Sequence, residues 1–474
     1  MTEIQELDDL TEVEIQRHRN CMTDPAERSI AAKRRWNANN PFTRLPEELI
    51  TYIFLLALSE GSGHLTPLRI GSICHDWRTI AWSASELWSS ITLCLEVQEE
   101  AAEIQSDLLE SWLLRAKKRP LSIVATHRSE DVEEWLINTK ALDLVLSYSE
   151  QWRSLSLDIP EKWLDWGLYK VKGKVPLLER LTIKGALKCD PEVFSVAPRL
   201  RSVDFKVNYY ESKELEEVLL PWSQLTELSF TADDIQTCLT VVERCSSLAH
   251  LALHQNSKPY YRPSISSSPS TINLNGITSF HISPNGELSS FMDSISAPHL
   301  KDVAVHSPRR TSRFLHTLCA LIARSGCAES IKRFSFVGYI PAEEEMVWFL
   351  SELRKLSELE LDNDERAPSF SNIFVNALHS PAPANASSSI RLLPNLVSFQ
   401  YVGLITLDNH AFLDMLDARY NVGGTGDDSQ LKSVVVRGYD ESIKEIGCLS
   451  QAESLRAQGM KVDMHYMASG RRNS

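Results

Sequence analysis

The sequence has few basic residues, no long apolar run and no secretion signal. Its 474 residues include 49 Lys and Arg against 63 Asp and Glu, so the formal net charge at pH 7 is -14. Nucleic acids need a basic surface, and this balance argues against a nucleic-acid partner. The acidic segment Met1–Leu10 lacks the basic and apolar parts of a signal peptide, and the apolar run Ile53–Leu58 is far too short to cross a bilayer. We therefore expect an intracellular protein, in the cytoplasm, the nucleus or both, with no membrane partner.

Catalytic and metal-binding motifs are also missing. The nine cysteines are scattered and never form a Cys-x-x-Cys pair, so we expect them to be buried small apolar residues and not metal ligands. The chain has no phosphate-binding loop, no Gly-x-Ser-x-Gly, no His-Glu-x-x-His and no set of kinase motifs. The sequence therefore predicts a protein that is not an enzyme and needs no cofactor.

Residues 41–90 contain a dense group of apolar residues at helical spacing. Leu45 and Pro46 open one helix, and two glutamates follow in its first turn, where the helix dipole favours negative charge. Pro67 suits the first turn of a second helix, which we expect to continue to Ile80. So small a bundle leaves apolar surface over, which usually marks a partner's groove. The apolar residues are Leu49, Ile50, Ile53, Phe54 and Leu56, then Leu68, Ile73, Cys74, Trp77 and Ile80.

In their order along the chain, these residues resemble the F-box pattern of Leu-Pro-x-Glu-Leu, Ile-Phe and a later Ile-Cys-x-x-Trp-Arg. The resemblance implies a three-helix module that binds the Skp-type adaptor of a cullin ubiquitin ligase. The long loop at 59–66 is similar to a fungal branch of the family. An ordinary small helical core is the alternative. The matching residues are Leu45, Pro46, Glu48, Leu49, Ile53, Phe54, Ile73, Cys74, Trp77, Arg78, Leu87 and Trp88. The residues expected to form or support the adaptor surface are Leu45, Pro46, Leu49, Ile53, Ile73 and Trp77.

Past residue 90 an internal repeat organises the chain. Its unit is an apolar residue, two others, a second apolar residue, one other, and a third apolar residue. On an extended strand the last two apolar positions face the same way, so each unit predicts a strand with one buried face. The units are Trp152-Leu155-Leu157, Leu178-Leu181-Ile183, Leu200-Val203-Phe205, Leu225-Leu228-Phe230, Leu248-Leu251-Leu253, Ile277-Phe280-Ile282, Leu300-Val303-Val305, Ile331-Phe334-Phe336, Leu356-Leu359-Leu361, Leu396-Phe399-Tyr401 and Leu431-Val434-Val436.

Between the strands, apolar residues recur at helical spacing. Further strands are expected at 91–93 and 120–124, with a helix over 101–115 between them. The alternation of strand and helix resembles a leucine-rich-repeat solenoid with a parallel concave sheet, although the asparagine typical of that repeat is mostly absent. The helical stripes are Ile235-Cys238-Leu239-Val242, Leu288-Phe291-Met292-Ile295, Leu315-Leu318-Cys319-Ile322, Met346-Phe349-Leu350-Leu353 and Phe370-Ile373-Phe374-Ala377.

The expected fold is therefore an α/β repeat protein with an N-terminal three-helix module and an irregular solenoid. We expect a flexible or helical arm at 1–40, the F-box at 41–90, the repeats at 91–465 and a disordered tail at 466–474.

The residues between the inward apolar positions should face the concave side of the sheet. There the charge changes along the array, from basic to histidine-rich to acidic. Basic clusters favour an acidic or phosphorylated protein substrate, and the alternative is that these side chains only solvate an exposed face. Strand spacing argues against a metal site among the histidines. The candidate substrate-binding residues are Arg180, Lys184, Lys206, His250, His254, His281 and His306.

The F-box resemblance and the polar face of the repeats together predict the substrate-recognition subunit of an SCF ubiquitin ligase, acting in ubiquitin-dependent protein degradation. The F-box would hold the adaptor and, through it, the cullin, and the repeats would hold a substrate whose identity the sequence does not give. The alternative is a scaffold or regulator that carries both modules and does not promote ubiquitination.

Overall fold

The computed structural model divides the chain into two compact units. The first comprises Met1–Val124 and Arg128–Trp152, and the second comprises Ala125–His127 and Arg153–Ser474. The described residues are 33, 37, 41–59, 66–95, 99–127, 139–185, 190–206, 214–232, 235–255, 271–283, 289–307, 314–365, 367, 369–379, 391–421, 430–439, 446 and 449–467. Apart from Lys33 and Asn37, the expected arm at 1–40 lies outside these residues, and so does most of the expected tail at 466–474.

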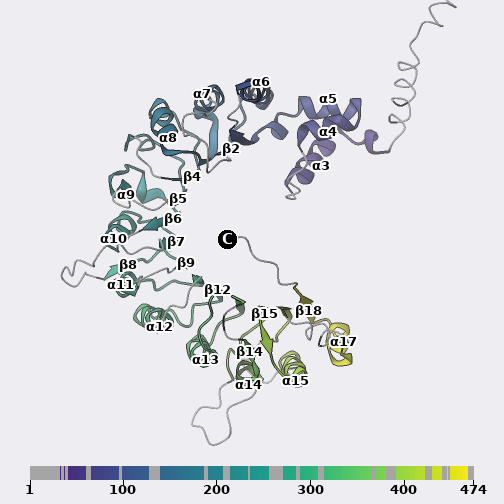
Figure 1. Ribbon diagram of the computed structural model, residues 1–474, viewed down its shortest axis with the longest axis vertical. Helices are drawn as coiled ribbons and strands as arrows, with labels where there is room; N and C mark the ends of the chain where they lie inside the picture. The colour runs from purple at the N-terminus through teal and green to yellow at the C-terminus, as the bar shows by residue number, and fades with distance from the viewer. Residues whose placement is uncertain are drawn as a thin grey trace, which may run out of the picture. The chain divides into compact units, whose positions relative to one another are not determined.

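Three short helices open the first unit (Figure 1). They are α3 (Glu47–Ser59), α4 (Pro67–Ile73) and α5 (His75–Ser83). The expectation of one helix from Pro67 to Ile80 was wrong, because Cys74 adopts an extended backbone that ends α4 and begins α5. The Cys74 thiol accepts a hydrogen bond from the Trp77 amide at 3.5 Å, so it caps α5 much as a serine would.

The rest of the first unit follows the expected strand, helix and strand. β1 (Ser90–Leu95) and the start of β2 (Leu121–His127) cover the two segments predicted to be extended, and α6 (Glu99–Ala116) covers the predicted helix. Along both strands buried residues alternate with more exposed ones, as expected of a strand with one face on the core. The remaining elements are η1 (Pro41–Arg44), η2 (Ser85–Trp88), α7 (Thr139–Ser147) and η3 (Ser149–Gln151).

A tryptophan cluster joins the short helices to α6 within this unit. The Trp88 ring is buried, with its centroid 5.3 Å from that of Trp82 and 4.8 Å from that of Trp112. The Arg115 guanidinium lies 5.0 Å from the Trp88 ring centroid, a cation–π contact. The Trp88 indole donates to the Ala81 carbonyl at 2.7 Å, so its only donor is satisfied.

The second unit is built on a parallel β-sheet. All eleven predicted strands are present, and every apolar residue of their triplets is 3% exposed or less. The triplets also lie in register: Leu155 pairs with Leu181, which pairs with Val203. The strands are β3 (Trp152–Asp158), β4 (Arg180–Lys184), β5 (Ser202–Lys206), β6 (Glu227–Ala232), β7 (His250–Gln255), β9 (Ser279–Ser283), β11 (Asp302–Ser307), β12 (Arg333–Gly338), β13 (Glu358–Asn363), β15 (Ser398–Gly403), β17 (Ser433–Gly438) and β18 (Lys461–Tyr466).

The last strand, β18, was not among the predicted repeats. The residue three before its buried Val462 is Gly459, so the apolar triplet is incomplete. β18 nevertheless pairs with β17 in the same parallel register. Backbone pairing with the preceding strand therefore extends the array beyond the point at which the apolar pattern ends.

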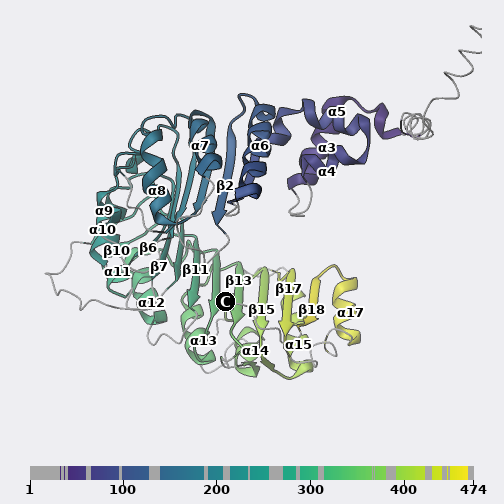
Figure 2. The same cartoon turned by 45° about the horizontal axis from the view of Figure 1, so that its top comes forward.

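Helices cover one side of this sheet, and Figures 1 and 2 show the strands of the second unit along its inner side with the helices outside. This arrangement explains why one face of each strand is apolar and the other polar. The elements are α8 (Glu161–Leu168), η4 (Tyr169–Val171), α9 (Glu214–Glu217), η5 (Trp222–Gln224), α10 (Ile235–Glu243), α11 (Ser289–Asp293), α12 (Phe314–Ser325), α13 (Glu343–Ser351), α14 (Asn372–His379), α15 (Asn409–Tyr420) and α17 (Ser450–Ala457).

Two of the predicted helices are shorter than expected, because one residue of each apolar stripe lies in a two-stranded parallel sheet and not in the helix. Ile295 lies in β10 (Ile295–Ser296), which pairs with β8 (Ile272–Asn273). Phe370 lies in β14 (Phe370–Ser371), which pairs with β16 (Ile405–Thr406). In both places the buried apolar residue keeps its helical spacing in the sequence, while its backbone pairs with a neighbouring strand.

Candidate protein-binding surfaces

Helix α3 is apolar on two faces, and only one of them is covered within the described part of the first unit. Ile50 and Phe54, four residues apart, are each 2% exposed. The Phe54 ring packs against Trp77 of α5, with centroids 5.0 Å apart, and against Phe42 at 6.4 Å. Leu49 is 50% exposed and Ile53 is 39% exposed. Helix α3 therefore has a second apolar face that the described core of the first unit does not cover.

Other apolar side chains of this region are exposed in the same way. We refer to them together as the α3–α4 apolar set. Scattered exposed apolar residues are ordinary on a protein surface, but seven of them within or just before two short helices leave an unusually large apolar area in contact with water. The set consists of Leu45, Leu49, Tyr52, Ile53, Leu56, Leu68 and Ile73.

The structure separates the six residues expected at the adaptor surface into two kinds. Leu45, Leu49, Ile53 and Ile73 are exposed, as is Pro46, and they are free to meet a partner. Trp77 is half-buried between Phe42 and Phe54, so it supports α3 from inside. Tyr52, Leu56 and Leu68 are also exposed, and they were not among the residues expected at the adaptor surface. The i, i+4 spacing of Tyr52 and Leu56 was the available signal for the first two.

The polar face of the sheet carries the candidate substrate-binding residues. Lys184 of β4 and Lys206 of β5 are register partners on neighbouring strands, and Arg180 lies at the other end of β4. The predicted basic region is weaker than the sequence indicated, because both lysines are paired with carboxylates. Lys184 Nζ lies 2.9 Å from Asp158 Oδ2, and Lys206 Nζ lies 3.2 Å from Asp204 Oδ2. Arg180 has no ion-pair partner among the residues that the structure describes.

Three of the four candidate histidines are close enough to influence one another. The ring centroids of His254 on β7 and His281 on β9 are 5.8 Å apart. Burial lowers the pKa of His254, and the charges of His281 and Lys206 lower it further. Burial also lowers the pKa of His281, followed by the charges of His306 and Lys206. His250 sits at the opposite end of β7 and takes no part in these interactions.

Hydrogen bonding also fixes one of these rings. His254 Nδ1 lies 3.2 Å from the Ser283 hydroxyl oxygen, and the two residues are register partners on β7 and β9. Within the described part of the chain, no three His, Cys, Asp or Glu residues are placed to hold a metal ion. The histidines therefore form a titratable polar cluster without the geometry of a metal centre.

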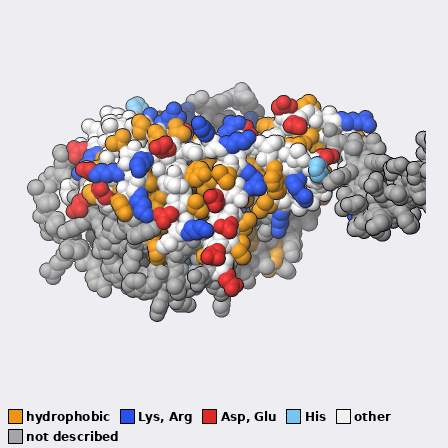
Figure 3. Space-filling view, turned by 90° about the horizontal axis from the view of Figure 1, so that it is seen from above, with side chains coloured by type: hydrophobic (Ala, Val, Ile, Leu, Met, Phe, Trp, Pro, Cys, Tyr) orange, Lys and Arg blue, Asp and Glu red, His pale blue; other side chains and the backbone are white. Residues whose placement is uncertain are grey.

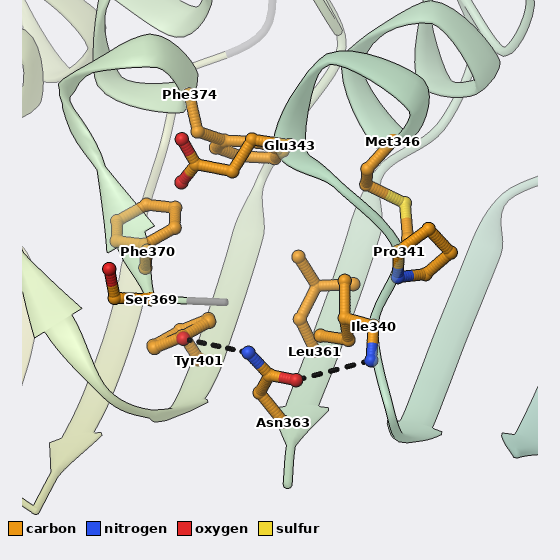
Figure 4. A pocket seen from close by; sticks show the side chains of 10 residues that line it. All are labelled: Ile340, Pro341, Glu343, Met346, Leu361, Asn363, Ser369, Phe370, Phe374 and Tyr401. Carbon is orange, nitrogen blue, oxygen red and sulfur yellow. Dashed lines mark hydrogen bonds between the residues drawn. The ribbon is translucent and has the colours of Figure 1, made fainter. Parts of the chain in front are cut away.

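A small cavity lies between β13, α13 and β14 (Figure 4). Its volume is about 20 Å³, which is enough for about one water molecule. Asn363 spans its base, accepting from the Ile340 amide at 3.2 Å and donating to the Tyr401 hydroxyl at 3.4 Å. Gly403 must be a glycine here, since its φ is +150° and a Cβ would lie 2.6 Å from the Tyr401 hydroxyl. This network ties strand ends together.

Asn363, the last residue of β13, is itself buried. It lies two residues after Leu361 and is 3% exposed. Glu343, also at the cavity, accepts hydrogen bonds from the Ser371 amide and hydroxyl, which ties α13 to β14.

On the face seen in Figure 3, basic, acidic and apolar side chains are interspersed among the described residues. This face has no broad basic area of the kind that nucleic acids need. Among the helices that the structure describes, none combines the length and apolar character needed to cross a bilayer.

Comparison with known proteins gives little further guidance. No protein-family model matches the chain, and no curated protein matches it. A protein of known crystal structure from Bacteroides fragilis is similar over 80% of this chain and 73% of its own, at 13% sequence identity and a TM-score of 0.28. The interpretation therefore depends on the residues themselves.

Proposed function

We propose that this chain is the substrate-recognition subunit of a cullin-based SCF ubiquitin ligase. Residues 41–90 would bind a Skp-type adaptor, and the polar face of the parallel sheet would bind a protein substrate. The catalytic steps would belong to other subunits.

The observation that carries the proposal is the exposure of apolar residues within the motif. Among the residues that resemble an F-box, Phe54 and Trp77 face inward, as does the neighbouring Ile50, whereas Leu49 and Ile53 face outward. An ordinary helical core would bury both groups. Burying an exposed leucine or isoleucine under a partner contributes about 1.5 to 3 kcal/mol, so several together would support a stable interface.

The second unit has a surface suited to binding a protein substrate, which is the other part of the proposal. Its strands place alternate polar side chains on one continuous face, from β3 to β18, while the apolar residues pack under the helices. Extended polar faces of repeat arrays are well suited to long protein segments.

Adaptor capture tests the first half. Replacing Leu45 and Pro46 by alanine should abolish capture of a Skp-type adaptor in a pull-down. The thermal unfolding of the second unit should not change, because both residues are exposed and lie in the first unit. Capture at the wild-type level would overturn the proposal.

Partner turnover then separates a substrate receptor from a scaffold, since both would bind the adaptor. Affinity purification under proteasome inhibition, with the wild type and the double variant compared, identifies partners. A partner that accumulates when this protein is deleted supports a receptor, and unchanged turnover of every partner supports a scaffold.

A further inference from the structure

On the sheet's polar face, three histidines and a lysine lie close together on neighbouring strands. His254 on β7, His281 on β9 and His306 on β11 lie on successive neighbouring strands, because β9 pairs with both β7 and β11. Lys206, on β5, is close enough to act electrostatically on His254 and His281. His281 and His306 are exposed and His254 is half-buried, so all three can reach a ligand.

We propose that Lys206, His254, His281 and His306 form an anion-binding site for a phosphate ester or a group of carboxylates on a protein segment. The inference rests on the proposed function for the choice of a protein segment as ligand. Imidazole and ammonium groups supply only donors when charged, and they suit the compact oxygens of an anion. Of the candidate substrate-binding residues, the proposed site therefore uses Lys206 and three histidines, and it does not include Arg180 and Lys184.

Protonation would control the affinity of this site. Asp204 offsets the charge of Lys206, and burial lowers the pKa values of His254 and His281, which favours their neutral forms. An anion favours the imidazolium form, so binding raises the histidine pKa values and takes up protons. Affinity should therefore rise as the pH falls. On the flanking strand β4, Lys184 lies beside Lys206 and is paired with Asp158 of β3. The charged groups at the opposite strand ends are Glu227 on β6, His250 on β7, Asp302 on β11 and Arg333 on β12.

Full-length protein with isotope-labelled histidine rings allows a site-resolved test by NMR. Inorganic sulfate is the first probe, because its charge does not change over the range used. Sulfate should shift the ring signals of His254, His281 and His306 saturably and raise their titration midpoints, while His250, the matched control, stays unchanged. No saturable shift, or an equal shift at His250, would overturn the proposal.

Three blocked tripeptides then identify the ligand chemistry: Gly-phosphoserine-Gly, Gly-Glu-Gly and Gly-Ser-Gly. Tighter binding of the phosphoserine peptide assigns a phosphorylated segment, and equal binding of the glutamate peptide assigns an acidic one. If one histidine pKa rises by about one unit on binding, affinity should increase by less than about fivefold between about pH 8 and about pH 6.5, because the pKa of the free site lies below the ordinary value of about 6.5. The full gain of about tenfold is reached only at lower pH. Binding of the serine peptide as tightly as the charged ones would contradict an anion site.

Two lysine variants provide a second matched comparison. Lys206→Met and Lys184→Met each remove a lysine that is paired with an aspartate on the polar face. Lys206→Met should weaken sulfate binding about fivefold or more, and Lys184→Met should change it less than about twofold. Equal effects would overturn the assignment. Because the adaptor takes no part in these measurements, their failure would leave the adaptor-binding proposal standing, and the reverse also holds.

Discussion

The rings of Phe54 and Trp77 lie 5.0 Å apart and join α3 to α5. This contact turns one side of α3 inward, and it leaves Leu49 and Ile53 on the surface. The same short motif therefore contains residues that hold the bundle together and residues available to a partner. Substitutions should separate these two roles.

Replacing Phe54 by alanine should destabilise the first unit by about 3 kcal/mol or more, because a large buried ring leaves a cavity. Leu49→Ala, at an exposed position on the same helix, should change stability by less than about 0.5 kcal/mol. Urea unfolding followed by tryptophan fluorescence measures both. Similar losses for the two variants would show that Leu49 belongs to the core.

Gly71 makes room for the tryptophan cluster. A Cβ at this position would lie 2.1 Å from the Trp82 ring, so Gly71→Ala should destabilise the first unit by about 1 to 3 kcal/mol. Combining it with Trp82→Leu should cost less than the sum of the two single changes, because the smaller side chain removes the clash. Additive losses in urea unfolding would mean that Gly71 and Trp82 are not in contact.

Much of the fold could be predicted because the apolar spacing is strong and local. The triplets identified eleven strands, and helices such as α10 and α12 followed from their stripes. Features set by contacts between distant residues could not be predicted. The break at Cys74 depends on a side-chain cap, and the shortened helices α11 and α14 depend on strand pairing elsewhere in the chain.

The candidate site shows the same division. Spacing alone identified an apolar surplus around α3, but it could not say that Ile50 faces inward while Leu49 faces out. Likewise, the sequence showed basic residues on the polar face, whereas their pairing with Asp158 and Asp204 depends on neighbouring strands and on side-chain conformation.

Arg419 is a buried charge that no sequence pattern indicated. It is 1% exposed, and its guanidinium donates to the carbonyls of Leu378 at 2.9 Å and Leu393 at 2.8 Å, and also to that of Leu392. Arg419→Ala should destabilise the second unit by about 3 kcal/mol or more, since buried carbonyls lose their donors. Thermal unfolding measures the loss, and a stability within about 0.5 kcal/mol of the wild type would contradict this role.

Acidification should weaken the second unit through His254 and His281. Their pKa values are lowered in the folded protein, so the unfolded chain binds more protons below about pH 6.5 and stability falls as the pH falls. The variant with His254→Gln and His281→Gln should lose less stability between about pH 7 and about pH 5.5 than the wild type does. His250→Gln is the control. An unchanged pH dependence in the double variant would show that these rings are not the source.

The affinity of the full-length chain for a purified Skp-type adaptor tests the central proposal most directly. Leu49→Ala with Ile53→Ala removes two outward residues of α3, and Ile104→Ala with Leu108→Ala removes an equally spaced, exposed pair from α6 in the same unit. Isothermal titration calorimetry should show binding at least about thirtyfold weaker for the α3 variant and unchanged for the α6 variant. Wild-type affinity in the α3 variant, or an equal loss in both, would contradict adaptor binding through this surface.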